Sequence, residues 1–244
     1  MGVGTMTRIL AALVLGVCMG SANAATIDIV FATDSSSSVG LAGWMLEQGF
    51  VRELINSIDA HEDGTNEYRF AVIDYSNLAV VVWQLTDSQD PLSDITDAVN
   101  SHPSRYQGSV SRADRAVSTA IDVFIDAIDN AGPVDAKYLM LIAGGLPTAT
   151  QGSGNPSPCP FAPTLNDLAI NTTVIGVGLS LREADAYECI VDDPGDIIML
   201  EGFDQTSFDA ALPLILSQVV PIPAAAYLLC SALALLGWLR RKAT

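Results

Sequence analysis

Apolar stretches separated by polar turns run through residues 26–220, and their periods predict alternating strands and helices. Continuous apolar runs rich in β-branched residues predict buried strands, because a strand covered on both faces has no polar side. Apolar residues three and four apart predict helices. The predicted strands cover residues 26–34, 68–76, 78–85, 137–145, 171–180 and 196–200, and the predicted helices cover 41–60, 90–100, 113–129 and 206–220.

This order of elements predicts one α/β domain over residues 25–219, with a doubly wound, mostly parallel sheet and helices on both faces. The strands at 68–76 and 78–85 are separated only by Ser76 and Asn77, which predicts a hairpin and therefore one antiparallel edge strand. A long stretch rich in Pro, Gly and Ser, residues 147–164, is predicted to be a loop insertion in this domain.

Residues 1–24 have the organisation of a signal peptide. A basic residue, Arg8, precedes a short apolar stretch, and the small residues Ala22 and Ala24 occupy the −3 and −1 positions of a cleavage site. We therefore expect export and cleavage after Ala24, with a lipoprotein route through Cys18 as the alternative.

Residues 220–244 have the composition of a membrane anchor. After Pro221 and Pro223, residues 224–239 contain only apolar or small side chains, and a basic cluster at residues 240–242 follows. A helix of this length rises about 24 Å, slightly less than a hydrocarbon core of about 30 Å. We expect a transmembrane helix over 224–239 whose basic tail stays on the cytoplasmic side.

The same tail resembles the PEP-CTERM sorting signals of Gram-negative bacteria, in the variant that begins VPxPAA. The matching residues are Val220, Pro221, Pro223, Ala224 and Ala225, with Ile222 where the name-giving form has glutamate. The resemblance implies an inner-membrane anchor, processing by an exosortase-type transpeptidase, and a final location on the cell surface or in an extracellular biofilm matrix. Whether the tail is cleaved or retained stays open.

The charge of the chain excludes one class of partner. The 244 residues carry a net charge of −17 at pH 7, and all 28 acidic residues lie between residues 25 and 220. Such a surface repels phosphate backbones, so we expect no nucleic-acid binding. The chain has two isolated histidines and neither a Gly-x-Ser-x-Gly elbow nor a Walker-type phosphate loop, so we expect no enzyme activity, no catalytic residues and no organic cofactor.

The stretch DIVFATDSSSSVG, residues 28–40, is the strongest candidate for chemistry. Its strand ends at Asp34, and ligands of open α/β sheets collect at the carboxyl ends of strands. Alternate residues of an extended loop point the same way, which groups Asp34 with Ser36 and Ser38. One carboxylate and two hydroxyls are hard oxygen donors, the kind of ligand that suits magnesium.

This stretch resembles the opening of the von Willebrand factor type A domain, whose Asp-x-Ser-x-Ser sequence forms a metal-ion-dependent adhesion site. The segments YRFAVIDYS, GSVSRADRAV, YLMLIAGGLPT and VIGVG match further family segments in the expected order. The resemblance covers residues 26–218 and implies a Rossmann-like α/β fold. It also implies a Mg²⁺ or Mn²⁺ site formed by Asp34, Ser36, Ser38 and Ser109, the last in the position of the family's metal-binding threonine.

The sequence departs from the family at two positions of the site. Gly144 stands where the family has its second aspartate, and Ala143 replaces a threonine. Losing one of two carboxylates lowers the expected cation affinity, by about 1–3 kcal/mol if a hydrogen bond to a charged group is the yardstick. The site is therefore either weakened or retired.

Two functions follow as expectations. In the first, an exported surface or matrix protein binds an extracellular protein or an acidic polysaccharide, which donates a carboxylate to the bound cation. In the second, the chain is a structural matrix component with a metal-free type A scaffold.

The cysteines predict one disulfide. Cys18 leaves with the signal peptide and Cys230 lies in the apolar tail, so Cys159 and Cys189 remain as an even pair in an exported domain. The alternative is two unpaired thiols.

Overall fold

A computed structural model describes residues 25–60, 66–85, 92–99, 103–148 and 156–220. The strands are β1 (Ala25–Asp34), β2 (Asn66–Tyr75), β3 (Ala79–Trp83), β4 (Ala136–Ala143), β5 (Ile170–Val177) and β6 (Ile197–Leu200). The helices are α2 (Gly40–Asp59), α3 (Leu92–Ala98), α4 (Ala113–Ala131), α5 (Ala162–Asp167), α6 (Leu181–Ala184) and α7 (Gln205–Val219). Short 3₁₀ turns lie at Pro103–Arg105, Cys159–Phe161, Glu188–Ile190 and Pro194–Asp196.

The described strands form one six-stranded sheet in the order β3-β2-β1-β4-β5-β6. All neighbouring strands pair in parallel except β2 and β3, which form an antiparallel hairpin at one edge. Strand β1 is central. From β1 the chain runs outward through β2 to β3 on one side, and it then runs outward from β4 through β5 to β6 on the other side. The α/β class, the mostly parallel sheet and the antiparallel edge are therefore confirmed.

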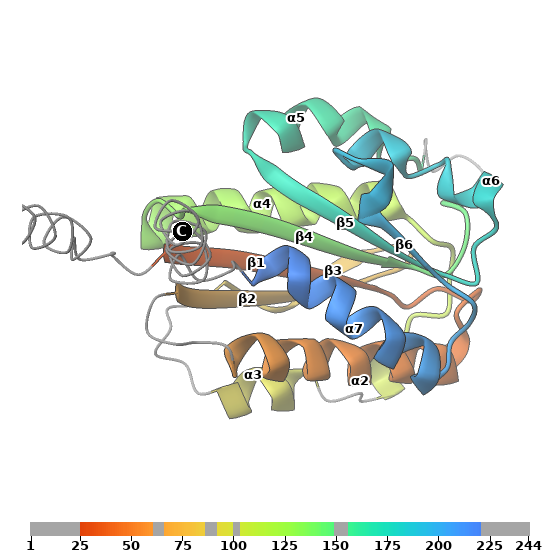
Figure 1. Ribbon diagram of the computed structural model, residues 1–244. Coiled ribbons are helices and arrows are strands. Elements are labelled where there is room, and N and C mark those ends of the chain that lie inside the picture. Colours follow the sequence, from red (N-terminus) through yellow and green to blue (C-terminus); the bar gives the residue numbers. More distant parts are fainter. Residues whose placement is uncertain (1–24, 61–65, 86–91, 100–102, 149–155, 221–244) are drawn as a thin grey trace, which may run out of the picture.

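Both faces of the sheet are covered, which explains why the strand sequences are apolar on both sides. In β1, Ile29 and Phe31 face one core and Val30 and Ala32 face the other. Helices α2, α3 and α7 cover the first face, and α4 and α5 cover the second, as the layers in Figure 1 show. The carboxyl ends of β1 and β4 consequently open onto one rim between two packed layers.

Most predicted boundaries agree with the structure to within a few residues, and their ends have local causes. Helix α4 stops at Gly132, which has a left-handed φ of 87°. Helix α7 begins after Asp204, whose carboxylate accepts a hydrogen bond from the backbone N–H of Ser207 at 3.0 Å. Helices α5 and α6 were not expected, because α5 begins within the predicted loop 147–164 and the residues of α6 were assigned to no element.

The predicted signal peptide (1–24) lies outside the described residues, as does the tail from residue 221 on, with its predicted transmembrane helix. Among the residues that the structure describes, no helix is both long enough and apolar enough to span a bilayer.

Candidate functional site

Asp34 is the centre of the candidate site. It ends β1 on the rim, and none of its side chain is exposed to solvent. Its Oδ1 atom accepts a hydrogen bond from the backbone N–H of Ser36 at 2.9 Å. Its Oδ2 atom accepts hydrogen bonds from the hydroxyl of Ser111 at 3.1 Å and from the backbone N–H of Gly144 at 3.2 Å. One carboxylate thus joins the loop after β1, the segment before α4 and the end of β4.

The two further serines of the predicted set lie side by side. The hydroxyl oxygens of Ser36 and Ser38 are 2.7 Å apart, with Ser36 buried and Ser38 exposed. Ser36 is held by the neighbouring rim segment, because it forms a parallel bridge with Ser109 and its carbonyl accepts a hydrogen bond from the hydroxyl of Tyr106 at 3.1 Å. The alternation that grouped Ser36 with Ser38 therefore corresponds to a real pair of hydroxyls.

The third hydroxyl at Asp34 belongs to Ser111, two residues beyond the predicted Ser109. Ser109 contributes its backbone instead: its carbonyl accepts from the N–H of Ser37 at 2.7 Å, and its own N–H donates to the hydroxyl of Ser76 at 3.2 Å. Ser111 was missed by the sequence analysis. The signal for it was present in the same Ser-Val-Ser stretch, directly before the predicted start of helix 113–129.

The place of a second aspartate is filled by apolar side chains. A Cβ atom added to Gly144 would lie 2.3 Å from Cγ2 of Val39 and 2.7 Å from Cζ of Phe203. Both distances are far below van der Waals contact, so no side chain fits at Gly144 unless these neighbours move. Phe203 comes from the segment between β6 and α7, a part of the chain that the sequence analysis did not connect with the site.

A second buried acid, Glu47 of α2, lies directly behind Asp34. Its Oε2 atom accepts the backbone N–H of Asp34 at 2.9 Å, while its buried Oε1 atom has no hydrogen-bond partner in the described part of the chain. Burial, reinforced by the charge of Asp34, raises the pKa of Glu47 well above its usual range. Burial also raises the pKa of Asp34, against hydrogen bonds from Ser36, Gly144 and Ser111 that lower it.

Sequence reasoning missed Glu47 as well. The sequence did contain a signal for it. Glu47 lies three residues after Trp44 and three before Phe50, and this spacing places the acid on the apolar face of the helix, where an unpaired charge is unfavourable.

The ion pairs of the described residues do not include these two acids. Arg105, for example, forms an ion pair of 2.7 Å with Asp74 of β2. Asp74 also accepts hydrogen bonds from Thr33 and Gln48. Among the described residues, no salt bridge includes Asp34 or Glu47. The rim therefore holds two buried carboxyl groups that lack a positive partner.

The described residues contain no group of three or more His, Cys, Asp or Glu side chains that would hold a metal on their own. Any cation here would rely on hydroxyl oxygens in addition to carboxylates. Such a donor set is hard, and it suits Mg²⁺ or Mn²⁺ better than softer metals that prefer thiolates or imidazoles.

Cys159 and Cys189 form a disulfide with their Cα atoms 5.3 Å apart. It links the 3₁₀ turn before α5 to the turn at Glu188–Ile190. At the other end of the Pro-rich stretch, Thr148 donates its backbone N–H to the carbonyl of Ser111 at 2.7 Å and accepts the N–H of Ser111 at its hydroxyl. One end of this stretch is therefore held against the rim at Ser111, and the other is held by the disulfide to the turn at Glu188–Ile190.

Comparisons with known proteins bear on the family and the fold. A protein-family model described as von Willebrand factor type A domain matches residues 28–211. No curated protein matches the chain.

Among solved structures, proximal thread matrix protein 1 of the mussel byssus is similar, at 20% identity and a TM-score of 0.65 over 79% of this chain and 48% of that one. A structure of the same protein with a zinc-occupied MIDAS motif gives 21% identity, a TM-score of 0.65 and the same coverage. A third gives 18% identity and a TM-score of 0.59 over 80% of this chain and 46% of that one. The chain thus spans about half the length of these proteins, and at this level of identity the likeness shows the fold.

Proposed function

Because this chain belongs to the von Willebrand factor type A domain family, whose members are typically non-catalytic binding domains, we propose that it binds a partner through a divalent cation at the rim. The residues that would hold the cation are Asp34, Ser36 and Ser38, with Ser111 in the role that the sequence analysis gave to Ser109. A bound Mg²⁺ or Mn²⁺ would supply a Lewis acid that takes a carboxylate of the partner as a further ligand.

The observation that carries this proposal is the arrangement of oxygen atoms at Asp34. The carboxylate contacts the Ser111 hydroxyl at 3.1 Å, and the loop that follows it holds the Ser36 and Ser38 hydroxyls 2.7 Å apart. The carboxyl groups of Asp34 and Glu47 are buried without a positive partner among the described residues. A divalent cation is the species that would balance this buried negative charge.

The packing at Gly144 supports a weak site. Val39 and Phe203 occupy the space of the family's second aspartate, so that ligand is absent and cannot be supplied by a small rearrangement. Water would have to complete the coordination shell, and the affinity would be lower than that of a site with two aspartates by about 1–3 kcal/mol.

We also propose that this binding takes place outside the cell, at the surface or in an extracellular matrix. The support is the signal-peptide pattern of residues 1–24 and the PEP-CTERM-like tail of residues 220–244, which would anchor the chain in the inner membrane until an exosortase-type enzyme processes it. The partners proposed are an extracellular protein or an acidic polysaccharide, since either can offer carboxylates.

The same packing favours a second candidate function, a structural matrix component whose type A domain binds no metal. If the Val39 and Phe203 side chains stabilise the rim without an ion, the domain is a scaffold and Asp34 only joins three segments.

Thermal melts of the purified full-length chain in detergent separate the two functions. A cation at ten times its Kd adds about 1.4 kcal/mol of stability, which raises the Tm by roughly 3–6 °C for a domain of this size. We expect millimolar MgCl₂ or MnCl₂ to produce this increase in the wild type and in the control Asp122→Asn, an exposed acid of α4, but not in Asp34→Asn. If neither metal changes the wild-type Tm or gives heat in titration calorimetry, the metal-free scaffold is the better description.

A further inference from the structure

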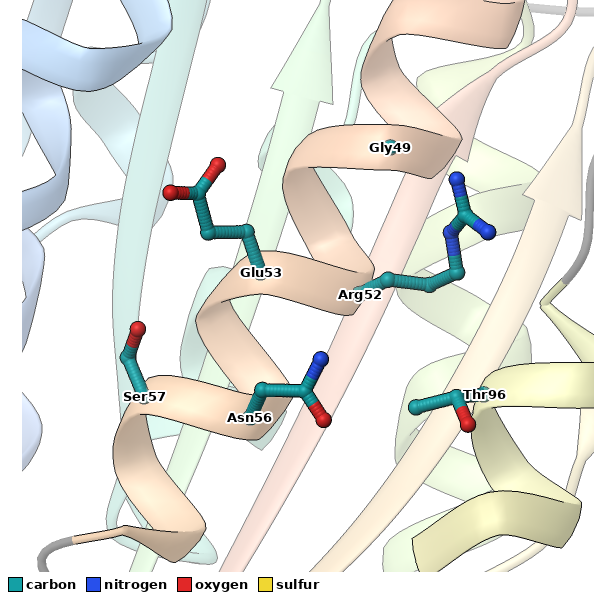
Figure 2. A pocket seen from close by; sticks show the side chains of 6 residues that line it. All are labelled: Gly49, Arg52, Glu53, Asn56, Ser57 and Thr96. Atoms are coloured by element: carbon teal, nitrogen blue, oxygen red, sulfur yellow. The ribbon is translucent and has the colours of Figure 1, made fainter.

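A polar groove lies between α2 and α3, formed by residues that take no part in the rim site. It is a shallow hollow that is wide open to solvent, with a volume of about 440 Å³. Its lining residues are Gly49, Arg52, Glu53, Asn56, Ser57 and Thr96. All of them belong to α2 except Thr96, which belongs to α3. Figure 2 shows Arg52 and Asn56 on the side of α2 that faces Thr96, and Glu53 and Ser57 on the opposite side.

Arg52 is the unusual member of this groove. Its Nε atom is buried and has no hydrogen-bond partner, and none of the ion pairs in the described part of the chain includes this residue. A buried donor without a partner is unfavourable and is rare in native structures. The unused Nε–H therefore indicates a hydrogen-bond acceptor that belongs in the groove.

Other arginines of the same chain show which acceptor satisfies such a group. Arg69 donates through Nε and Nη2 to the two carboxylate oxygens of Asp28 at 2.6 and 2.8 Å. Arg112 binds Asp114 in the same side-on manner at 2.7 and 2.6 Å. A planar carboxylate matches the Nε–Nη2 edge of a guanidinium, which makes it the natural ligand for Arg52 as well.

Glu53, the acid next to Arg52 in the sequence, is not its carboxylate partner. Figure 2 shows the side chains of Arg52 and Glu53 on opposite sides of α2. Glu53 is directed toward α7, where its Oε2 atom accepts a hydrogen bond from Nε2 of Gln205 at 3.4 Å. The positive charge on the α3 side of the groove is thus available to a ligand.

The space around the guanidinium is also open. Gly49, one turn before Arg52 on the same face, has no side chain, and a Cβ atom built there would meet only the Nη2 atom of Arg52, at 3.9 Å. One turn further on, Asn56 presents an amide to the same groove. Thr96 directs its methyl group toward α2, because its hydroxyl donates to the carbonyls of Leu92 and Ser93 within α3, each at 3.0 Å. A ligand held by Arg52 would therefore contact the amide of Asn56 and the methyl group of Thr96.

We propose that this groove binds a uronic acid unit of a polysaccharide. The guanidinium of Arg52 holds the carboxylate side-on, the amide of Asn56 forms hydrogen bonds with ring hydroxyls, and the methyl group of Thr96 contacts the apolar face of the ring. A sugar acid combines the chemistries that this side of the groove offers, one fixed positive charge, a neutral amide and a small apolar contact. The site needs no cation and shares no residue with the Asp34 site, so it stands whether or not the rim binds metal.

The test is titration calorimetry of the full-length chain in detergent with about 1 mM EDTA, which removes any rim-bound cation. The probes are trigalacturonate, the neutral galactotriose and a triglutamate peptide. We expect trigalacturonate to bind, and we expect the neutral sugar and the peptide to bind at least about tenfold more weakly, because the first lacks the carboxylate and the second lacks the sugar ring.

Three variants locate the binding. Arg52→Gln removes the charge, and Gly49→Gln fills the space beside it while leaving Arg52 in place; each should weaken trigalacturonate binding about tenfold or more. Arg182→Gln makes the same change of charge at an exposed arginine of α6 and should leave binding unchanged. Far-ultraviolet circular dichroism checks that each variant is folded.

The proposal is overturned if the wild type does not bind trigalacturonate, or if Arg52→Gln and Gly49→Gln both bind it as the wild type does. Equal binding of galactotriose would show that the charge is not used. Equal binding of triglutamate would show that the sugar is not recognised, which also contradicts the proposal.

Discussion

The tight packing at Gly144 gives a sharp prediction about a single methyl group. Gly144→Ala places a Cβ atom 2.3 Å from Cγ2 of Val39 and 2.7 Å from Cζ of Phe203. The adjacent Gly145→Ala places the same atom 3.4 Å from the hydroxyl of Ser38, an ordinary contact distance. Neither glycine has a positive φ, so backbone strain does not separate the two variants. The same substitution is thereby tested at neighbouring positions with different surroundings.

The magnitude follows from how far the neighbours must move. Carbon atoms pack at about 3.5–4.0 Å, so Val39 or Phe203 must retreat by roughly 1 Å. Overpacking of this kind costs about 1–3 kcal/mol, and it is opposed by about 0.4–1 kcal/mol gained when Ala restricts the unfolded chain. We expect Gly144→Ala to lose about 1–2 kcal/mol and to melt about 2–8 °C lower, and Gly145→Ala to melt at or slightly above the wild-type Tm.

The same reasoning predicts what restores the missing ligand. Gly144→Asp alone should fold poorly and gain no cation affinity, because its side chain has no space. The combination Val39→Ala/Phe203→Leu/Gly144→Asp removes the obstructing atoms and should bind Mg²⁺ more tightly than Val39→Ala/Phe203→Leu, by about 1–3 kcal/mol. Thermal melts and titration calorimetry in MgCl₂ measure both effects.

Two results would refute this reasoning. If Gly144→Ala and Gly145→Ala melt at the same temperature, the space beside Gly144 is not closed as described. If Gly144→Asp alone has the wild-type Tm and binds Mg²⁺ tightly, the apolar side chains of Val39 and Phe203 do not keep an acid out.

Two further predictions concern stability. Replacing both Cys159 and Cys189 by Ser opens a loop of 30 residues and should lower the free energy of unfolding by about 3 kcal/mol. The Tm of the variant should be about 6–12 °C lower and should no longer respond to a reducing agent. An unchanged Tm would mean that the disulfide does not restrain the fold. Because burial raises the pKa of Glu47, the native state retains a proton that the unfolded chain loses above about pH 4.3, so metal-free stability falls as pH rises through this window. Glu47→Gln removes that loss, and in EDTA its Tm advantage over the wild type should grow from about pH 4 to pH 8; parallel Tm curves would contradict a raised pKa.

The sheet could be predicted from sequence because its strands carry their own signal. In β1 and β2 the last eight residues are buried on both faces, and such strands have mainly apolar sequences with no polar side. Helix α5 has no comparable signal, since only Leu165 of its six residues is buried. Short helices of this kind depend on tertiary contacts, which here include the nearby Cys159–Cys189 disulfide.

The site was predictable only as far as it is local. Asp34, Ser36 and Ser38 follow from one extended loop, and their grouping needed no other segment. Ser109 and Ser111 are two residues apart, so the alternation of an extended segment gives both the same side. Which of them reaches Asp34 depends on how the segment lies against the loop after β1, and that is fixed by pairing between distant parts of the chain.

Glu47, which the sequence analysis missed, and Gly144, which it could not explain, have one physical consequence in common. An aspartate at Gly144 would have made a third acid beside the buried carboxyl groups of Asp34 and Glu47, and the apolar Val39 and Phe203 side chains take its place. The metal-free rim then holds only two acids, whose pKa values burial raises, so protons can neutralise them when no cation is bound. Cation binding at this rim would have to displace those protons, and its affinity should therefore fall as the pH falls. Such a rim would be stable when empty, and a cation would bind it weakly and reversibly because it must exchange with those protons.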